Sequence, residues 1–418
     1  MIVVQKFGGT SVGSVALIER AAERIIACRA EGNDVAVVVS AMGEETDRLV
    51  DLAQAIQRRP DPREMDVLLA AGEQVSIALL AMALKERGCE ARSYLADQVP
   101  IHTEAVHNKA RITHVETERL HADLAAGIVP VIAGFQGVDV HGNVTTLGRG
   151  GSDTTAVAIA VALGAGECQI LSDVAGVYTT DPRLVPEAQL VQRLSFDEML
   201  ELASQGSKIL QIRAVEFAAK HGTPIRVMSS AVRGTGTLIA AEEGGMEAPL
   251  VSGVAFNRDE AEIIVTGVPQ EPSAGYRILA PVSAANIEVD MIVLNAADGG
   301  RVDVSFTVHR GDFESALAHV REAMAEHREC EVVGNDRVVK ISVIGVGMRS
   351  HAGIATRMFA ALARERINVR TVSTSEIKIS VLVDEAHLER GVACLHEAFD
   401  LDQPPEQRPL LLQARPVL

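Results

Sequence analysis

Short apolar runs recur through the first half of the chain and predict its strands. They lie at residues 2–5, 35–39, 128–133 and 169–172. Each run is almost continuously apolar and rich in β-branched side chains, a pattern typical of parallel strands that are buried on both faces. We therefore expect a parallel sheet, whose strands need long crossover connections.

Apolar residues at helical spacing mark these connections. They predict helices that contain residues 17–26, 49–56 and 67–85. Thr10 and Ser11 supply hydroxyls before the first helix, so we expect them to cap its amino terminus. Strands and helices in this order predict an α/β fold with a parallel sheet between two layers of helices.

Polar and glycine-rich clusters follow the predicted strands. They occupy residues 6–11, 40–43, 134–137 and 172–173. Because open α/β sheets bind their ligands outside the carboxyl ends of the strands, we expect these clusters to share one binding edge.

A further glycine-rich segment, TLGRGGSD at residues 146–153, combines one arginine, one carboxylate and two hydroxyls. Its glycines allow positive φ angles and a close approach of the backbone to a ligand. Residues 152–155 have the composition of an N-cap, so we expect an apolar helix to follow from Ala156. The amino terminus of a helix favours anions, and the segment is a candidate binding site. The alternative is an ordinary capped turn with a solvated Arg149.

Composition narrows the classes of function. The chain has 418 residues, of which 47% are hydrophobic and 23% charged, so we expect two or three globular domains. A net charge of −17 and 3% aromatic residues argue against a nucleic-acid surface. The five cysteines are widely spaced without a C-x-x-C pair, which predicts neither a disulfide framework nor a zinc site. The first apolar run is too short to span a membrane, so we expect a cytoplasmic protein without a membrane partner.

The second half of the chain contains an internal repeat. The glycines and apolar runs of residues 267–289 recur at residues 345–369, each time in the order strand, helix, strand, strand, helix. We therefore expect a first domain at residues 1–245, followed by two modules at residues 246–335 and 336–418.

Four motifs, in this order along the chain, resemble those of the aspartate kinases in the amino-acid kinase superfamily. They read KFGGTSV at 6–12, TLGRGGSD at 146–153, SDVAGVYTTDPR at 172–183 and GSK at 206–208. The resemblance covers nearly the whole chain. A Walker phosphate loop and a complete dinucleotide-binding fingerprint are both absent from the sequence.

The resemblance implies phosphorylation of the aspartate side chain by ATP. That carboxylate has an unperturbed pKa of ~3.9, so it is ionised at neutral pH and needs no general base. Transfer between two anions then depends on cations and positioning. The resemblance implies that Lys6 and Lys208 contact the phosphates and that Asp153 orients Lys6, although Asp153 also suits a simple helix cap.

The expected cofactors are ATP and Mg²⁺, delivered as MgATP and held by phosphate oxygens and water, so no protein ligand to the metal is named. By resemblance, the other nucleotide contacts are Gly8, Gly9, Ser172, Asp173, Tyr178 and Arg183. The family usually has Thr at position 172 and a second Asp at position 175. Ser172 keeps the hydroxyl, whereas Ala175 removes one polar contact.

The substrate L-aspartate requires opposite charges at a fixed separation. The forked guanidinium of Arg149 suits its α-carboxylate, and Glu73 suits its α-ammonium. By resemblance, hydroxyls of Ser40, Thr46 and Ser152 complete the contacts. A Glu in an apolar helix is more often partly exposed, so the role of Glu73 depends on the match of the surrounding GEQ motif.

The segment at residues 94–104, which lies over the substrate in the family, departs from the family pattern. It has Ala96 in place of a usual glycine and Glu104 in place of Asp. A kinase for a related acidic amino acid such as glutamate is therefore one alternative, and a catalytically weak amino-acid sensor is another. The i,i+5 spacing of His102 and His107 favours structural roles over metal binding.

The repeated half resembles two ferredoxin-like βαββαβ ACT domains, which bind amino-acid effectors and pair edge to edge. We expect a homodimer or a larger oligomer, and a C-terminal tail that packs back on the first module. The first step toward lysine, threonine and methionine is the function that the resemblance implies.

The expected effector is lysine rather than threonine. The family's threonine site uses the Asp and Gly of an Asp-x-Pro-Gly turn and a Gln before an Asn. Here Gln270 and Ser273 occupy the turn, and Leu294 precedes Asn295. The second module keeps residues that match the family's lysine-responsive segments, among them Met348, Ser375 and Glu376.

Overall fold

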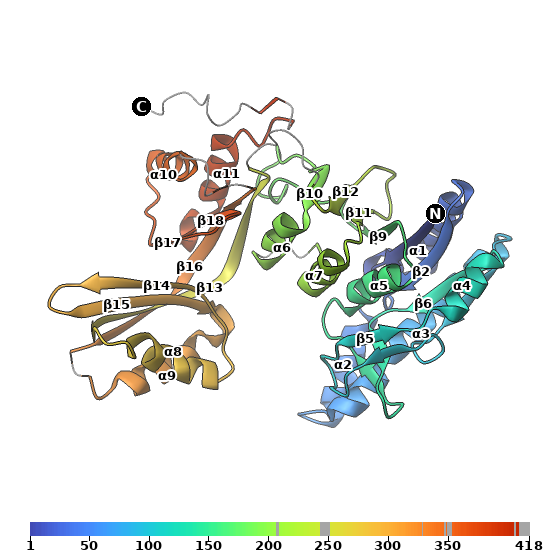
Figure 1. Ribbon diagram of the computed structural model, residues 1–418, viewed down its shortest axis with the longest axis horizontal. Coiled ribbons are helices and arrows are strands. Elements are labelled where there is room, and N and C mark those ends of the chain that lie inside the picture. The colour runs from blue at the N-terminus through green and yellow to red at the C-terminus, as the bar shows by residue number, and fades with distance from the viewer. Residues whose placement is uncertain are drawn as a thin grey trace. The chain divides into compact units, whose positions relative to one another are not determined.

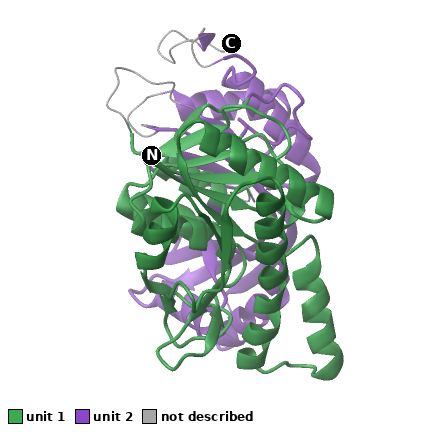
Figure 2. Cartoon of the chain, turned by 90° about the vertical axis from the view of Figure 1, so that its right-hand side faces the viewer, with its two compact units in different colours: residues 1–177, 190–203, 208–245 green, residues 178–189, 204–207, 246–418 purple. Residues whose placement is uncertain are grey.

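The structure is a computed structural model that describes residues 1–205, 209–242, 251–327, 329–346, 348, 353–404 and 407–408. The chain divides into two compact units (Figure 2). Unit 1 comprises residues 1–177, 190–203 and 208–245, and unit 2 comprises residues 178–189, 204–207 and 246–418. The C-terminal tail after residue 408 lies outside the described residues.

Unit 1 is built on an eight-stranded sheet in the order β10-β12-β11-β9-β1-β2-β6-β3 (Figure 1). All neighbouring strands pair in parallel except β11 and β12, so the predicted parallel sheet is confirmed. The strands are β1 (Ile2–Phe7), β2 (Asp34–Val39), β3 (Ala91–Tyr94), β6 (Val129–Ala133), β9 (Glu167–Ser172), β10 (Arg193–Ser195), β11 (Ile225–Ser229) and β12 (Thr237–Ala240).

Helices cover both faces of this sheet. Helices α1 (Val15–Ala30) and α3 (Pro62–Glu86) share an apolar core with alternate residues of β1, β2 and β6. Helix α5 (Gly151–Ala162) contacts β1, β2 and β9. Because successive side chains of a strand point to opposite faces, Lys6 lies on the α5 side. Unit 1 also contains α2 (Glu45–Ile56), α4 (Glu118–Ala125), α7 (Ile212–His221) and most of α6 (Phe196–Ser204).

Two helices begin at other residues than predicted. Helix α1 is capped by Ser14, whose Oγ accepts the N–H of Leu17 at 3.3 Å, whereas Thr10 and Ser11 belong to the 3-10 turn η1 (Gly9–Ser11). Helix α5 begins at Gly151, with its N-cap Gly150 in the left-handed conformation and no side-chain cap. Residues 152–155 therefore lie inside α5, and their side chains are free for other contacts.

Among the described residues, α3 is the one helix that is long and apolar enough, by these two criteria alone, to cross a membrane. Half of its apolar window, 50%, is buried inside the protein, and Leu80 and Leu84 belong to the core of unit 1. It also buries Asp66 and Glu73. These features are those of a core helix.

A smaller sheet in unit 1 leads into the glycine-rich segment. Its strands are β4 (Ile101–Thr103), β5 (Ile112–Val115), β7 (Gln136–Val138) and β8 (Val144–Thr146), in the order β5-β4-β7-β8. Strand β8 ends at Thr146, directly before the turn that carries Arg149, and it packs against α3.

Unit 2 contains one six-stranded antiparallel sheet in the order β14-β15-β13-β16-β18-β17. Its strands are β13 (Gly253–Pro269), β14 (Val289–Ala297), β15 (Arg301–His309), β16 (Glu331–Ile344), β17 (Thr371–Thr374) and β18 (Lys378–Asp384). Its helices are α8 (Ala274–Ala284), α9 (Phe313–Met324), α10 (Ile354–Arg364) and α11 (Leu388–Ala398), with short 3-10 turns η2 (Arg310–Asp312) and η3 (Glu385–His387).

The two repeats form two halves of this sheet, each with its own apolar core. The long strands β13 and β16 run through both halves. Residues 253–257 of β13 pair with residues 340–344 of β16, whereas residues 262–266 pair with residues 331–335. The second repeat thus obtains its fourth strand from residues that precede the first repeat, a pairing that the sequence repeat does not reveal.

Two segments from the first half of the sequence, residues 178–189 and 204–207, belong to unit 2. The carbonyl of Thr179 accepts the N–H of Val254 at 2.7 Å, and its hydroxyl lies 2.9 Å from His396 Nε2. Gln205, which is 2% exposed, accepts a 3.1 Å hydrogen bond from the hydroxyl of Ser342. These contacts anchor both segments in the second half of the six-stranded sheet.

Candidate active site

The carboxyl ends of four central strands bring the predicted clusters to one edge of the large sheet. Strand β1 pairs with β2 on one side and with β9 on the other, and β2 pairs with β6. The turns that follow β1, β2 and β6 carry Gly8, Ser40 and Gly134, and Ser172 is the last residue of β9. This is the arrangement expected for a ligand-binding edge in an open α/β sheet.

An ion pair joins β1 to helix α5 at this edge. Lys6 Nζ lies 2.6 Å from Asp153 Oδ1, and the two side chains are 13% and 11% exposed. Asp153 is in the first turn of α5, where the helix dipole also favours a carboxylate. Sequence reasoning therefore identified two residues, 147 positions apart by their numbers (153 − 6), that do lie in contact.

The turn after β1 packs closely against the loop after β2. A Cβ atom on Gly9 would lie 2.8 Å from the carbonyl oxygen of Ala41, and Gly43 N–H donates to the Gly9 carbonyl at 3.0 Å. A Cβ on Gly8 would lie 3.5 Å from Lys6 Nζ. Any larger residue at position 9 would separate the two turns, so glycine is needed there for the close approach.

Glu73 is buried on α3 behind this loop. Its side chain accepts the Ala41 N–H through Oε1 at 3.0 Å, whereas Oε2 has no hydrogen-bond partner among the described residues. The residue is 3% exposed, and burial raises the pKa of its carboxyl to about 7. A Cβ on Gly72 would lie 2.8 Å from that of Ala41, so the glycine allows α3 to approach the loop. The usual expectation of a partly exposed Glu is wrong for Glu73.

The three predicted substrate hydroxyls differ in burial. Ser40 and Thr46 are partly buried at the end of β2 and in the first turn of α2. Ser152 is 6% exposed and packs against Gly134, where an added Cβ would lie 2.7 Å from Ser152 Oγ. Gly134 therefore leaves room for the Ser152 side chain at the end of β6.

The turn that carries Arg149 has two glycines in the left-handed region, Gly148 with φ 79° and Gly150 with φ 70°. Gln211 donates its side-chain amide to the Arg149 carbonyl at 2.8 Å, so the backbone of the turn is held by the residue before α7. The Arg149 side chain is exposed.

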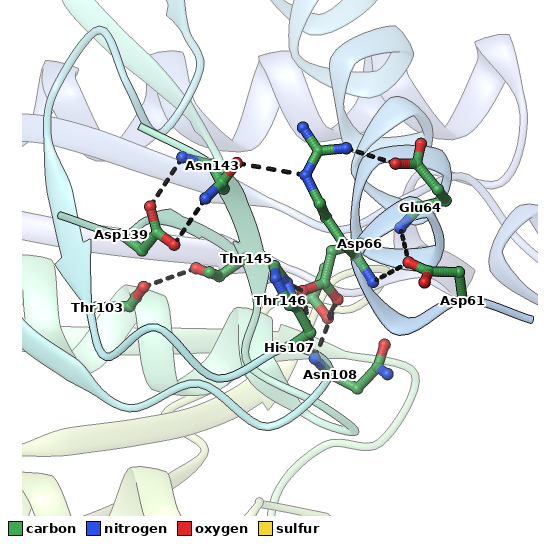
Figure 3. Close-up of polar contacts among 11 residues, drawn as sticks. Asp61, Glu64, Asp66, Thr103, His107, Asn108, Asp139, Asn143, Thr145 and Thr146 are labelled. Atoms are coloured by element: carbon green, nitrogen blue, oxygen red, sulfur yellow. Dashed lines mark hydrogen bonds and ion pairs between the residues drawn. The ribbon is translucent and has the colours of Figure 1, made fainter. Parts of the chain in front are cut away.

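Sequence reasoning missed Asp66, a fully buried carboxylate at 0% exposure on α3. It accepts hydrogen bonds from three groups: His107 Nδ1, the Asn108 N–H and the Thr146 hydroxyl (Figure 3). Its sequence signal was an acidic residue one position before the predicted apolar helix at residues 67–85. That signal is weak, because acidic residues are common in the first turns of helices.

The predicted nucleotide residues fall in different parts of the structure. Ser172 ends β9 in unit 1 and Asp173 follows it, and the Ser172 hydroxyl donates to Asp173 Oδ1 at 2.8 Å. Tyr178 and Arg183 belong to unit 2. The exposed Arg183 pairs with Asp181 through Nε and a terminal nitrogen, and this pair lowers the pKa of the Asp181 carboxyl. Lys208 lies outside the described residues.

The predicted effector residues belong to unit 2. Gln270 and Ser273 precede α8, and Asn295 lies on the edge strand β14 next to Leu294, which is 53% exposed. Met348 is buried, and its N–H donates to the Glu376 carbonyl at 3.0 Å. The Ser375 N–H donates to the Lys378 carbonyl at 2.9 Å. Residues 349–352 of the same segment lie outside the described residues.

The two histidines of interest each contact a carboxylate. His102 Nε2 lies 2.9 Å from Glu116, and His107 Nδ1 lies 2.7 Å from Asp66. The described part of the chain contains no group of three or more His, Cys, Asp or Glu residues that could hold a metal ion.

This edge can bind a ligand that carries both signs of charge. Lys6 offers a cation beside a helix amino terminus, which suits phosphate oxygens. Glu73 offers a buried oxygen that has no partner among the described residues, which suits an ammonium group. The two features together fit a phosphate donor and an amino acid.

Comparisons with known proteins agree with this chemistry. A model described as the amino acid kinase family matches residues 1–229, and a model described as an ACT domain matches residues 341–399. An aspartokinase of Pseudomonas aeruginosa is 56% identical over 408 residues, which cover 97% of this chain and 99% of that protein.

Two solved structures are similar over almost the whole chain. The structure of E. coli aspartokinase III in complex with aspartate and ADP has a TM-score of 0.78 at 26% identity and covers 96% of this chain and 100% of its own. The structure of E. coli aspartokinase III in complex with lysine and aspartate has a TM-score of 0.75 at 26% identity, with coverage of 95% and 99%.

Proposed function

Because the chain belongs to the aspartate kinases of the amino-acid kinase family, with a C-terminal ACT region, we propose that Lys6, Asp153 and Glu73 form the centre of its active site. An aspartate kinase transfers the γ-phosphoryl group of ATP to the side-chain carboxylate of L-aspartate. The products are 4-phospho-L-aspartate and ADP. The observation that carries the proposal for the site is the buried Glu73 oxygen for which the described part of the chain supplies no partner, beside an Ala41 N–H that holds the other oxygen.

Glu73 accepts the α-ammonium group of aspartate at this oxygen. A buried carboxylate that lacks one partner is costly to ionise, and an incoming cation removes this cost. Arg149 binds the α-carboxylate with its planar fork, and Ser40, Thr46 and Ser152 supply hydroxyls. Together these groups hold the side-chain carboxylate toward the donor.

Lys6 binds the phosphates and neutralises the charge that develops during transfer. Asp153 orients Lys6 and keeps its ammonium at the end of β1. As the carboxylate oxygen of aspartate forms a bond to the γ-phosphorus, the bond from that phosphorus to the bridging oxygen of ADP breaks. Lys208, Gly8, Gly9, Ser172, Asp173, Tyr178 and Arg183 complete the ATP contacts, and Mg²⁺ arrives with the nucleotide. The ADP bound to E. coli aspartokinase III supports this choice of donor.

A hydroxylamine-trapping assay tests the function and the residue roles. We expect MgATP and L-aspartate to give the coloured hydroxamate of an acyl phosphate. Lys6→Ala should lower turnover by a factor on the order of 10²–10³, by analogy with the loss of one donor to a transition state. Arg149→Ala should chiefly raise the aspartate KM. Unchanged turnover in the first variant, or an unchanged KM in the second, would contradict these roles.

The same assay separates the alternatives. Glutamate as the better substrate would favour a related acidic amino-acid kinase, for which the Ala96 segment is the argument. Absence of any hydroxamate would favour an amino-acid sensor, for which Ala175 is the argument. Neither alternative accounts for the retained pair of Lys6 and Asp153 as directly as aspartate phosphorylation does.

Regulation by lysine rather than threonine completes the proposal. Glu271 is the one acid near the position where the family has an Asp, and it is engaged by Arg277 at 2.9 Å and by the Ser273 hydroxyl at 3.3 Å. It is therefore a poor substitute for an acid that pairs with a ligand ammonium. The lysine bound to E. coli aspartokinase III supports lysine as the class of effector. Cooperative inhibition by sub-millimolar threonine in the hydroxamate assay would refute this.

The wider organisation follows the same family logic. We propose a catalytic domain at residues 1–245, ACT modules at residues 246–335 and 336–418, the second of which also uses the strand of residues 253–257, and self-association through the ACT modules. The edge strands β14 and β17 of the six-stranded sheet are the elements that a partner chain can extend. We place the enzyme in the cytoplasm, at the start of lysine, threonine and methionine synthesis. A monomer in light scattering at micromolar concentration would contradict the assembly.

A further inference from the structure

Three segments that are far apart in the sequence meet at the Asp66 carboxylate. The side chain of Asp66 is fully buried on α3, and it receives hydrogen bonds from the 107–108 segment and from the end of β8 (Figure 3). His107 Nδ1 lies 2.7 Å from Oδ2, the Asn108 N–H donates at 3.1 Å to Oδ1, and the Thr146 hydroxyl donates to Oδ1. Asn108 takes a positive φ of 63° as it turns its N–H toward the carboxylate.

These contacts hold one end of the turn that carries Arg149. Thr146, the last residue of β8, is 1% exposed, and its carbonyl also accepts the Ala110 N–H at 3.0 Å. A Cβ on Gly148 would lie 2.9 Å from the Asn108 carbonyl oxygen, so the 107–110 segment lies directly against the turn. Asp66 thus fixes both the start of the turn and the segment that packs on it.

The region around α7 holds the other side of the turn. Arg213 donates to the Leu147 carbonyl at 2.6 Å and to the Ala110 carbonyl at 2.9 Å. Gln211 donates to the Arg149 carbonyl at 2.8 Å. With its carbonyls held by these donors and its start held by Asp66, the backbone on which Arg149 sits has little freedom to shift.

Asp66 and Glu73 lie on the same helix. They are seven residues apart on α3, which is nearly two full turns, so both side chains leave the same side of the helix about 10 Å apart along its axis. Glu73 is the proposed partner of the substrate ammonium, and Arg149 is the proposed partner of the α-carboxylate. Through Thr146, Asp66 connects the Arg149 turn to the helix that carries Glu73.

We propose that Asp66 is a positioning residue that sets the separation between Arg149 and Glu73, and that this separation selects aspartate over longer acidic amino acids. The proposal rests on the function proposed above. The α-groups of the substrate are held by two charges of fixed separation, so the reach of the side-chain carboxylate toward the phosphorus depends on that separation. A displacement of about 1 Å in such a site costs roughly 100-fold in rate.

The test compares Asp66→Asn with a matched control in the same part of unit 1. Asp139 is also buried, at 5% exposure, and accepts the N–H groups of His141 and Asn143 at the far end of the β7–β8 hairpin. Among the described residues its hydrogen-bond partners lie at residues 141 and 143 of the hairpin turn, and Figure 3 shows its pairing with Asn143. Asp139→Asn therefore reports the effect of weakening a buried acid in this sheet without disturbing the turn. Melting temperatures of both variants are measured beside their kinetics.

We expect Asp66→Asn to raise the aspartate KM by roughly 10- to 100-fold, with the ATP KM changed less than about threefold. The preference for aspartate over glutamate should fall at the same time. Asp139→Asn should keep the wild-type aspartate KM even where its melting temperature falls. Thr146→Val removes the hydroxyl that donates to Asp66, so it should reproduce part of the rise in the aspartate KM. Thr146→Ser keeps this hydroxyl and should have the wild-type KM.

Equal aspartate KM values and substrate preference in wild type and Asp66→Asn would overturn the proposal, as would an equal rise in KM in Asp139→Asn. If Asp66→Asn does not fold, the pair Thr146→Val and Thr146→Ser decides the question, and equal KM values for these two refute it. A wild-type chain that gives no hydroxamate from aspartate overturns the proposed function as well. A wild type that turns over aspartate, with unaltered KM in these variants, overturns only this inference.

Discussion

Helix α3 buries two carboxylates, Asp66 and Glu73, which differ in how completely they are hydrogen-bonded. Asp66 is surrounded by donors from a histidine, a backbone N–H and a hydroxyl. Glu73 receives one N–H, and its second oxygen has no partner in the described structure. The two residues have nearly equal exposure, 0% and 3%, so burial alone does not distinguish them.

The difference separates a structural group, Asp66, from the group that we propose as the partner of the substrate ammonium, Glu73. A buried polar group stabilises a fold when its hydrogen bonds are complete, and it destabilises the fold when they are not. The raised pKa of Glu73 expresses this cost. A site that is destabilising when empty gains most from its ligand, whereas Asp66 gains nothing more from one. Similar residues on one helix thus suit different roles, which are stability for Asp66 and, as we propose, recognition for Glu73.

The largest expected effect tests the stabilising half of this comparison. Asp66→Ala leaves three donors without their acceptor, one of them the buried Thr146 hydroxyl, so we expect a loss of about 3–5 kcal/mol in the free energy of unfolding, as for the removal of one partner from a buried polar pair. Thermal melting should fall by on the order of 10 °C. Differential scanning calorimetry measures this. A melting temperature within the error of wild type would show that Asp66 does not hold these segments together.

The next effect tests the binding half. Glu73→Gln keeps the shape of the side chain and removes its charge, so the α-ammonium group loses one charge-assisted hydrogen bond. We expect the aspartate KM to rise by about 10- to 150-fold, which corresponds to roughly 1.5–3 kcal/mol. The hydroxamate assay gives this KM, and Asp139→Asn is the control. A wild-type KM in Glu73→Gln would remove the main support for the site.

The same Glu73→Gln variant should be more stable than wild type above pH 7. The folded state keeps the Glu73 proton up to about pH 7, whereas the unfolded chain releases it near the ordinary value of 4.5. The folded state therefore binds more protons between these values, and stability falls as the pH rises through that window. Melting curves at pH 5 and pH 8 should show that this part of the pH dependence is lost in the variant. If the melting temperatures of wild type and Glu73→Gln depend equally on pH, the raised pKa of Glu73 is contradicted.

A smaller effect concerns the pH dependence of activity. Binding of the ammonium group needs ionised Glu73, so protonation below its pKa of about 7 removes the binding form of the free enzyme. We expect kcat/KM for aspartate to fall by up to about tenfold per pH unit below that value, since this ratio reports groups of the free enzyme. Glu73→Gln should lack this limb of the profile. A wild-type profile that is flat from pH 5 to pH 8 would contradict the expectation.

The smallest effect comes from a carboxylate that lies close to the same region and is 30% exposed. Glu45, in the first turn of α2, forms a forked pair with Arg48 at 2.6 and 2.9 Å. Because solvent screens this pair, Glu45→Gln should leave both the melting temperature and the aspartate KM near their wild-type values. A shift as large as that of Asp66→Ala would show that ion pairing rather than burial decides which carboxylates matter.

Much of the catalytic unit could be predicted from local patterns. Strands β1, β2, β6 and β9 have continuous apolar runs because both of their faces are covered by helices. The proximity of Lys6 and Asp153 follows from the position of the first at the end of a central strand and of the second at the start of a helix. Burial of Glu73 could not be predicted, because the apolar pattern of a helix does not show which of its polar residues are buried.

Three further features depend on contacts between distant segments. The role of Asp66 depends on Asn108 turning its N–H inward, for which the sequence contains no clear signal. Ser14 rather than Ser11 caps α1 because the chain first forms the turn that packs Gly9 on Ala41. The membership of Tyr178 and Arg183 in unit 2 depends on the pairing of Thr179 with β13. None of these contacts produces a periodic pattern of apolar and polar residues in the sequence.

The shared strands β13 and β16 make the first repeat an insertion in the second. The chain leaves the second half of the six-stranded sheet after Asn257 and returns opposite the same residue at Lys340, since these two residues are partners in the antiparallel register. A short turn between them would remove residues 258–339 and leave a four-stranded sheet in the order β17-β18-β16-β13.

Such a deletion would also remove the acids that fasten the insertion to its host. Lys340, 3% exposed, pairs with Glu260 at 2.7 Å, and Arg370 pairs with Glu262 at 2.7 Å. A shortened chain would therefore keep its topology but leave Lys340 and Arg370 without these counter-charges. The chain could thus lose the first repeat without a change in the topology of the second. Its ion pairs would not survive this loss, so we expect a chain without the module to carry other residues at positions 340 and 370.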